Sequence, residues 1–249
     1  MNIKKTILTI CLIALAAPFN AQTLQEAEQA YQTGNYEASA EIYEQILHNG
    51  QESFVLYYNL GNCYYRLNQN GLAILNYERA LRIKPSDSDA KENLALAESR
   101  TTDRIAAIPQ FLLAKWYTSV VQLLTPRGWR TLLLCLLAIC CAAIVILMLS
   151  NDYRQRRTMA LIGFVSVILL AATIAVTISA SIRASRHDYA VVTQQAIVVK
   201  GAPEYDSVDK FIIHEGTKAK VDETLGGWHK IRLSDGTTGW VPISDIEII

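Results

Sequence analysis

Two long uncharged stretches constrain this chain more than any other feature. The first runs from Thr131 to Leu149 and the second from Thr158 to Ile182. A helix needs roughly 20 apolar residues to cross the hydrocarbon of a bilayer, so residues 129–149 and 158–182 are predicted to be transmembrane helices. The intervening residues 150–157 are too few to form a domain. The two helices should therefore form a hairpin.

The N-terminus has the order of a secretory signal. Lys4 and Lys5 precede a short apolar run, and a small residue follows at Ala21. Residues 1–21 are predicted to be a signal peptide, with an uncleaved N-terminal anchor as the alternative. Export of the N-terminal region places the hairpin turn, residues 150–157, in the cytoplasm and the chain after residue 182 outside. The arginines of the turn agree with this orientation.

Helical spacing of apolar residues continues from Gln22 to Thr101, and the pattern recurs after about 34 residues. A looser copy spans about 20–53, and the clearest copy spans 54–87. Residues 88–101 resemble one more opening helix, which would cap the solenoid. The clearest copy carries the tetratricopeptide signature at Tyr57, Leu60, Gly61, Tyr64, Ala73, Tyr77, Ala80, Leu81 and Pro85. Residues 22–101 therefore resemble the tetratricopeptide-repeat (TPR) family, an all-α solenoid.

That resemblance implies a concave groove, lined by the first helix of each repeat, that holds a segment of a partner protein. Asn62 and Asn93 stand where some relatives grip a peptide backbone or a terminal carboxylate. Those relatives have a lysine where this chain has Tyr58, so capture of a C-terminal carboxylate is not expected. The alternative is that the tyrosines of this face only pack against and shield the helices. By repeat position, the predicted groove residues are Leu24, Glu28, Tyr31, Tyr58, Asn62, Tyr65 and Arg66.

Residues 102–128 link the repeats to the first membrane helix. Trp116, Val120 and Leu123 follow one another at steps of three and four residues. This spacing predicts an amphipathic helix at the lipid interface. The alternative is that the apolar stripe packs against the repeat domain.

The pattern after residue 188 changes to alternation of β-branched residues, with turn signals such as Gly226-Gly227 and Asp235-Gly236. Residues 188–249 are therefore predicted to fold as a small all-β barrel. They look like a bacterial SH3 domain, most specifically at Gly239-Trp240-Val241. Trp228 and Trp240 would either form a surface that binds peptide or cell wall, or belong to the core.

The sequence contains no recognisable chemical site. Its four histidines have no cysteine or carboxylate at metal-ligand spacing, and it has no phosphate-binding loop or nucleophile motif. A formal net charge of zero gives no basic footprint for nucleic acid. We therefore expect a multidomain membrane protein that is not an enzyme, with no catalytic residue, cofactor or metal, and that binds protein partners.

The complete order of signal peptide, TPR repeats, membrane hairpin and SH3-like domain resembles the Bacteroides aerotolerance operon protein E (BatE-like) family. The resemblance implies a Gram-negative inner-membrane protein with both soluble domains in the periplasm. It also implies that the protein acts together with von Willebrand factor A-type membrane proteins and a MoxR-type ATPase, with a role in aerotolerance or envelope stress. The expected function is a periplasmic scaffold, and the alternative is an envelope receptor that binds peptidoglycan through its SH3-like domain.

Overall fold

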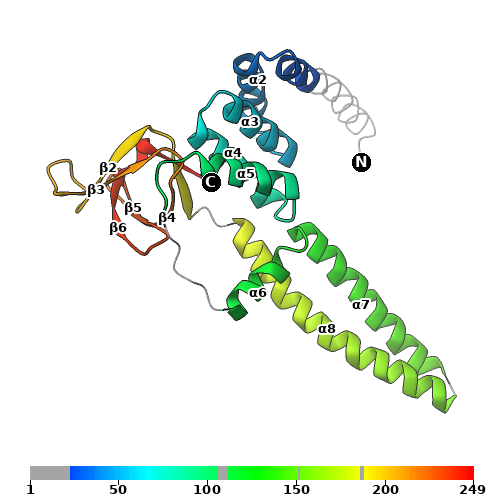
Figure 1. Cartoon of the computed structure of the whole chain (residues 1–249). Coiled ribbons are helices and arrows are strands. Elements are labelled where there is room, and N and C mark those ends of the chain that lie inside the picture. Colours follow the sequence, from blue (N-terminus) through cyan, green and yellow to red (C-terminus); the bar gives the residue numbers. More distant parts are fainter. Residues whose placement is uncertain (1–22, 106–111, 151, 186–187) are drawn as a thin grey trace, which may run out of the picture. The chain divides into compact units, whose positions relative to one another are not determined.

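The computed structural model describes residues 23–105, 112–150, 152–185 and 188–249 (Figure 1). The chain divides into two compact units. One unit combines the N-terminal helices with the C-terminal sheet, and the other contains the two long apolar helices with the short helix before them. The predicted signal peptide lies outside the described residues, as does the part of the predicted interfacial segment from 106 to 111.

The repeat region is helical throughout, as its sequence predicted. Three of its helices begin at side-chain caps, because Asn35, Ser53 and Asp87 each accept a hydrogen bond from the backbone N–H three residues later. The helix α4 (Asn70–Ile83) ends shortly before Pro85, which cannot donate the next helical hydrogen bond. The region consists of helical residues 23–32, α2 (Tyr36–His48), α3 (Phe54–Arg66), α4 (Asn70–Ile83) and α5 (Ser88–Ser99).

The helices α3 and α4 approach closely because position 61 has no side chain. A Cβ atom added to Gly61 would lie 2.7 Å from the ring of Tyr77, which is almost fully buried. Tyr77 therefore fills the space beside the glycine, as the TPR signature predicts. Another face of α4, carrying Gly71, Ile74 and Glu78, contacts the C-terminal sheet instead.

The C-terminal segment forms one seven-stranded antiparallel sheet in the order β3-β2-β6-β5-β4-β1-β7. Its inward residues, among them Val199, Ile231 and Val241, form a buried apolar cluster. The strands are β1 (Tyr189–Val192), β2 (Ala196–Lys200), β3 (Asp209–His214), β4 (Lys218–Leu225), β5 (Trp228–Arg232), β6 (Thr238–Pro242) and β7 (Ile246–Ile248), with a short 3-10 helix at Ile243–Asp245 before β7.

The prediction of a closed barrel was wrong, because β3 and β7 lie at opposite ends of the strand order and do not pair. The edge strand β7 has only three residues, and its carbonyl at Ile248 accepts a hydrogen bond of 2.6 Å from Arg79 of α4. An edge strand presents unpaired backbone groups, which a helix can cover. Here α4 satisfies part of the edge that barrel closure would have paired.

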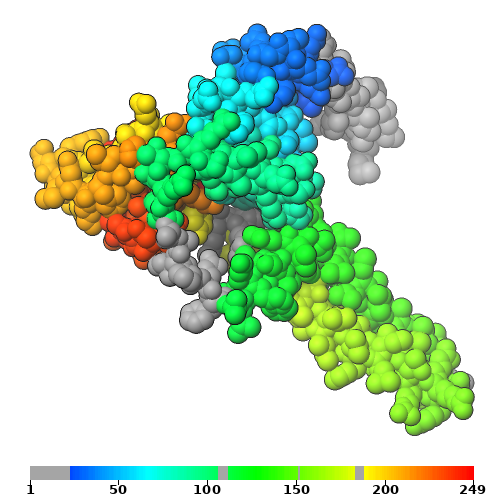
Figure 2. All heavy atoms as spheres, viewed as in Figure 1, coloured from blue at the N-terminus to red at the C-terminus, as the bar shows by residue number. Residues whose placement is uncertain are grey.

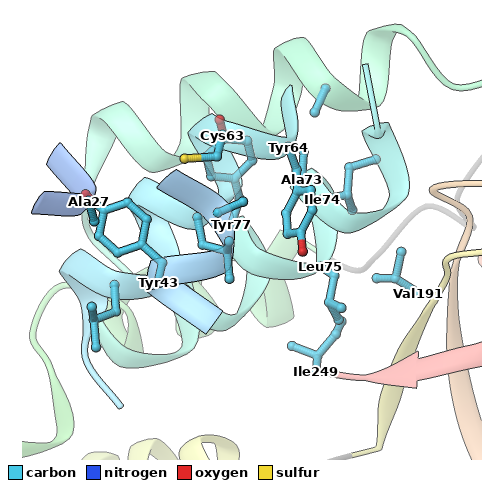
Figure 3. Close-up of a cluster of buried hydrophobic side chains, with 14 of the residues drawn as sticks. Ala27, Tyr43, Cys63, Tyr64, Ala73, Ile74, Leu75, Tyr77, Val191 and Ile249 are labelled. Carbon is cyan, nitrogen blue, oxygen red and sulfur yellow. The ribbon is translucent and has the colours of Figure 1, made fainter. Parts of the chain in front are cut away.

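The sheet and α4 share a buried contact surface, the helix–sheet seam. Val191 of β1 and the terminal residue Ile249 belong to the same buried cluster as Ile74 and Leu75 of α4 (Figure 3). Gly216, in the turn before β4, approaches Ile74 so closely that an added Cβ would lie 2.8 Å from its Cδ1. The seam consists of Gly71, Ile74, Leu75, Glu78 and Arg79 on α4, and of Val191, Glu215, Gly216, Lys218, Ile248 and Ile249 on the sheet side.

Polar contacts fix the orientation of the seam. The backbone N–H of Gly71, in the first turn of α4, donates a hydrogen bond of 2.6 Å to the carboxylate of Glu215. A carboxylate at this position satisfies an unpaired helical N–H and complements the positive end of the helix dipole. Lys218 forms an ion pair with Glu78 about two turns further along the same face. The sheet therefore supplies both a cap and a counter-charge to α4.

The segment after α5 also lies against the sheet (Figure 2). The carboxylate of Asp103 accepts hydrogen bonds of 2.7 Å from the backbone N–H of His214 and from the hydroxyl of Thr217, and it lies 2.8 Å from Nδ1 of His214. Burial of Asp103 opposes its ionisation, but the bonds from Thr217 and His214 outweigh burial and lower its pKa.

Replacing Asp103 with asparagine should lower the free energy of unfolding at pH 7 by about 1–2 kcal/mol, because hydrogen bonds to a charged group are lost. A lowered folded-state pKa gives stability that is complete above the unfolded value of about 3.9 and is lost as the pH falls through the folded value. The difference between wild type and Asp103→Asn should therefore shrink below about pH 4. Chemical denaturation in mild detergent between pH 7 and pH 3 measures it.

Asp206→Asn is the control for this prediction, since Asp206 is exposed in the loop between β2 and β3. It should leave the unfolding free energy nearly unchanged at every pH. An equal loss in both variants, or a difference that grows in acid, would contradict the assigned role of Asp103.

The second unit consists of α6 (Leu112–Val121), α7 (Pro126–Leu149) and α8 (Tyr153–Ser185). By length and composition, α7 and α8 could each cross a membrane. α8 buries small or polar residues at intervals of seven, namely Ser166, Thr173 and Ala180. Seven residues are close to two helical turns, so these three share one face, while larger apolar residues cover the outside of both helices. An apolar exterior around a packed interior is the arrangement that a lipid environment stabilises.

The short helix α6 packs against the open end of the hairpin, where α7 begins and α8 ends. The indole N–H of Trp129 donates a hydrogen bond of 3.0 Å to the carbonyl of Val121, and Tyr117 contacts the Ser179 hydroxyl at 2.6 Å. Trp116 remains exposed. Placement of this helix at a lipid interface stays a prediction. The predicted turn at 150–157 is partly helical in the structure, because α8 begins at Tyr153.

Candidate partner-binding surfaces

A hydrogen-bonded ladder of polar side chains joins α3, α4 and α5. The amide nitrogen of Asn93 donates to the hydroxyl of Tyr58 at 3.1 Å and to Oδ1 of Asn62 at 3.0 Å. Oδ1 of Asn62 also accepts from the hydroxyl of Tyr77 at 2.7 Å. The structure therefore brings two predicted groove residues, Tyr58 and Asn62, into one network, which we call the Tyr–Asn ladder.

The ladder leaves polar groups unused. Among the described residues, the amide nitrogen of Asn62 and the carbonyl oxygen of Asn93 have no hydrogen-bond partner. Burial raises the pKa of Tyr77, with a smaller contribution from Tyr58, so its phenol stays protonated and can donate. An amide donor beside an amide acceptor matches the C=O and N–H groups of an extended peptide backbone.

Two arginines at one end of α3 are held by tyrosines. Nε and Nη2 of Arg66 donate to the hydroxyl of Tyr36 at 3.0 and 2.7 Å. Tyr36 in turn packs edge-to-face with Tyr31, at 5.1 Å between ring centroids. The guanidinium of Arg100 lies 3.8 Å from the ring centroid of Tyr65. The predicted groove residues Tyr31, Tyr65 and Arg66 thus sit in aromatic–cationic contacts.

The other two predicted groove residues join neither network. Leu24 is partly buried and packs against the apolar cluster of the repeats. Glu28 is exposed, and it lies near enough to Tyr43 to add to the effect of burial in raising the pKa of that phenol. Leu24 therefore serves packing, whereas Glu28 is available to solvent.

The sheet carries a depression of about 370 Å³ on its surface. Trp228 forms part of its wall and meets the exposed ring of Tyr205 edge-to-face at 4.9 Å. Trp240 does not line this depression, and Nζ of Lys230 lies 5.7 Å from its ring centroid; both tryptophans are largely buried, with 5% of Trp228 and 9% of Trp240 exposed. The lining residues are Gln194, Ala196, Ile197, Val198, Lys200, Tyr205, Trp228, Pro242 and Asp245.

Sequence reasoning did not find several members of these surfaces. Tyr36 and Arg100 lie outside the first-helix positions that define the expected groove, and Tyr205 lies in a loop without periodic pattern. Arg100 follows the last repeat pattern, so no signal in the sequence connected it with Tyr65. In the described part of the chain, no cluster of three His, Cys, Asp or Glu side chains could hold a metal ion.

Replacing Asn93 with alanine should lower the free energy of unfolding of the repeat region by about 1–3 kcal/mol, because Tyr58 and Asn62 each lose a partly buried hydrogen bond. Hydrogen exchange of α3 and α5 measures the change. The matched control is Lys91→Ala, at an exposed position of the same helix. Equal protection in both variants would show that the ladder does not stabilise the repeat.

Comparison with known families agrees with the helical architecture. No curated protein matches this chain. The tetratricopeptide repeat family model matches residues 54–87, which contain α3 and α4. The match does not extend to the other segments, so the BatE-like resemblance is not established by it. Residues 54–87 are a tetratricopeptide repeat, a motif that suggests binding to other proteins.

Proposed function

We propose that this protein is a non-enzymatic, membrane-anchored scaffold whose repeat region binds an extended segment of a protein partner. The observation that carries this proposal is the Tyr–Asn ladder. The amide nitrogen of Asn62, on the tetratricopeptide repeat, and the carbonyl oxygen of Asn93, on the helix α5 that follows it, have no partners among the described residues. A preformed polar face loses little side-chain freedom on binding. The hairpin would hold this face near the membrane and so raise the local concentration of membrane partners.

The proposal includes an orientation. The repeat region and the sheet, which precede and follow the hairpin, form one packed unit. Two membrane spans between them would return the chain to the side from which it came, which is compatible with that unit. With an exported N-terminus, both modules would face the periplasm of a Gram-negative inner membrane. The proposed partners are those that the BatE-like resemblance implies, von Willebrand factor A-type membrane proteins and a MoxR-type ATPase complex.

Cysteine labelling tests this orientation without altering the buried C-terminal residue. A membrane-impermeant maleimide should label Asp206→Cys in cells with a permeabilised outer membrane, because Asp206 lies in an exposed loop of the sheet. It should label Tyr153→Cys, at the exposed start of α8, only after lysis. The opposite pattern would overturn the orientation.

Site-specific photo-crosslinking tests the binding face. A photoreactive residue at Tyr65 should form adducts with a membrane partner, and one at Glu41, on the exposed side of α2, should not. Adducts at Tyr65 should disappear when Tyr58→Ala is added, because the neighbouring ladder is broken. Adducts that persist in that background, or that form equally at Glu41, would refute binding on this face.

A second candidate function is binding of peptidoglycan by the sheet. The exposed ring of Tyr205, which packs on the largely buried Trp228 beside a depression, supports it, since aromatic rings offer apolar faces for sugars and peptides. The full-length chain should then co-sediment with purified cell wall, and Tyr205→Ala should reduce the bound fraction. Val208→Ala, at an exposed loop position outside the depression, is the control. Absence of co-sedimentation removes this candidate.

A further inference from the structure

We propose that the segment bound by the repeat region is acidic, with Asp or Glu side chains directed at Arg66 and Arg100. This inference rests on the proposed function, because it specifies the chemistry of the partner at the same face. Three features of the structure support it. Neither arginine has a carboxylate partner among the described residues, both guanidinium groups are held in place, and Arg66 stands one helical turn from Asn62 of the Tyr–Asn ladder.

The two arginines differ from the other paired cations of this unit. Lys218, Arg79 and Lys200 each face a carboxylate within 4 Å. Among the described residues, Arg66 bonds only to the neutral hydroxyl of Tyr36, and Arg100 bonds to the amide oxygen of Asn68 at 3.3 Å. Their main local compensation is the weak negative end of the helix dipole, of α3 for Arg66 and of α5 for Arg100. Two positive charges at this end of α3 thus lack a carboxylate.

Both guanidinium groups are held in place before any ligand arrives. Tyr36 receives two of the five N–H donors of Arg66, and the Tyr65 ring supports one face of Arg100. The hydrogen bond from Arg66 to Tyr36 raises the pKa of Arg66, so its charge persists. A fixed guanidinium with free donors matches the two oxygens of a carboxylate in a bidentate pair.

The spacing along α3 suits an extended peptide. Tyr58, Asn62 and Arg66 occupy successive positions four residues apart on one helix. Four residues rise about 6 Å in a helix, and two residues of extended chain span about 6.6 Å. A segment whose backbone bonds to Asn62 and Asn93 could therefore place a side chain two residues away beside Arg66. Acidic residues at alternating positions fit this register.

Selection from a library of displayed random nine-residue peptides on the full-length protein in neutral detergent tests the inference. Peptides that bind should be enriched in alternating Asp or Glu. A synthetic copy of the selected consensus should bind at least ~10-fold more tightly than its Gln-substituted counterpart, and weaken in high salt. The double variant Arg66→Gln with Arg100→Gln should lose a similar factor. Lys91→Gln, which is about 200° around α5 from Asn93, should not.

The outcomes separate the inference from the proposed function. If peptides without acidic residues are selected, or if the arginine double variant binds the acidic peptide as well as wild type, the acidic specificity is refuted. If the Asn93→Ala variant then no longer binds the selected peptides, binding at this face is still supported. If the library yields no peptide that binds, both the inference and the proposed groove fail. Unchanged hydrogen exchange of α3 in the double variant confirms that the fold is retained.

Discussion

Alanine at position 216 should lower the free energy of unfolding by about 3 kcal/mol, the sum of a strained backbone and an overpacked contact. Gly216 has φ +84°, and an added Cβ would lie 2.5 Å from Thr101 and 2.8 Å from Ile74. The turn before β4 cannot move away freely, because Gly216 N–H donates to the Val192 carbonyl at 2.8 Å. Hydrogen exchange should show faster exchange in both α4 and the sheet.

The control is Gly227→Ala, which separates the two contributions. Gly227 has φ +85°, but nothing lies within 4 Å of an added Cβ. It should cost only about 1 kcal/mol, the backbone contribution alone. If the two variants lose equal stability, close packing at the seam contributes nothing. If Gly216→Ala affects only the sheet, α4 and the sheet do not form one cooperative unit.

Local sequence patterns predicted the elements of this fold well. The spacing of the TPR signature located α3 and α4 because small and large residues must alternate where two helices touch, as Gly61 and Tyr77 do. Uncharged stretches located α7 and α8 for a similar reason, since length and apolarity are properties of one continuous segment. Alternating β-branched residues likewise identified strands of the sheet.

Contacts between distant segments could not be predicted in this way. Gly71 and Glu215 are separated by 144 residues, with the hairpin between them, and neither belongs to a periodic pattern. The same limit explains the error about the barrel. Strand patterns indicate where strands form, but whether the edge strand β7 pairs with another strand or is covered by α4 depends on residues such as Arg79 in a different region.

The candidate site was predicted only where the repeat pattern determines a residue's position. Tyr58 and Asn62 follow from repeat position, because that position fixes which face of α3 they occupy. Arg100 depends on how the chain leaves α5, which the repeat pattern does not describe. The two tryptophans expected either at a surface or in the core, Trp228 and Trp240, are both largely buried, and of the two only Trp228 also lines the depression.

An aspartate at position 191 should open the helix–sheet seam. Val191 is fully buried in the cluster that contains Ile74, Leu75 and Ile249. A carboxylate at this position would lose its water, and its cross-strand neighbour Lys218 is already paired with Glu78, so Val191→Asp should cost about 3–5 kcal/mol. Residues 188–249 should become sensitive to limited proteolysis, and amides of α4 should exchange faster.

Val198→Asp is the matched control, because Val198 is 38% exposed on β2 of the same sheet, away from the seam. Its carboxylate can remain hydrated, so it should change stability by less than about 1 kcal/mol. Equal sensitivity of the two variants would mean that the sheet and the repeats are separate bodies. Faster exchange of α4 in Val191→Asp alone would mean that segments on either side of the hairpin stabilise each other. A partner that binds the repeats would then bind to one cooperative unit, which is linked to the hairpin both before α7 and after α8.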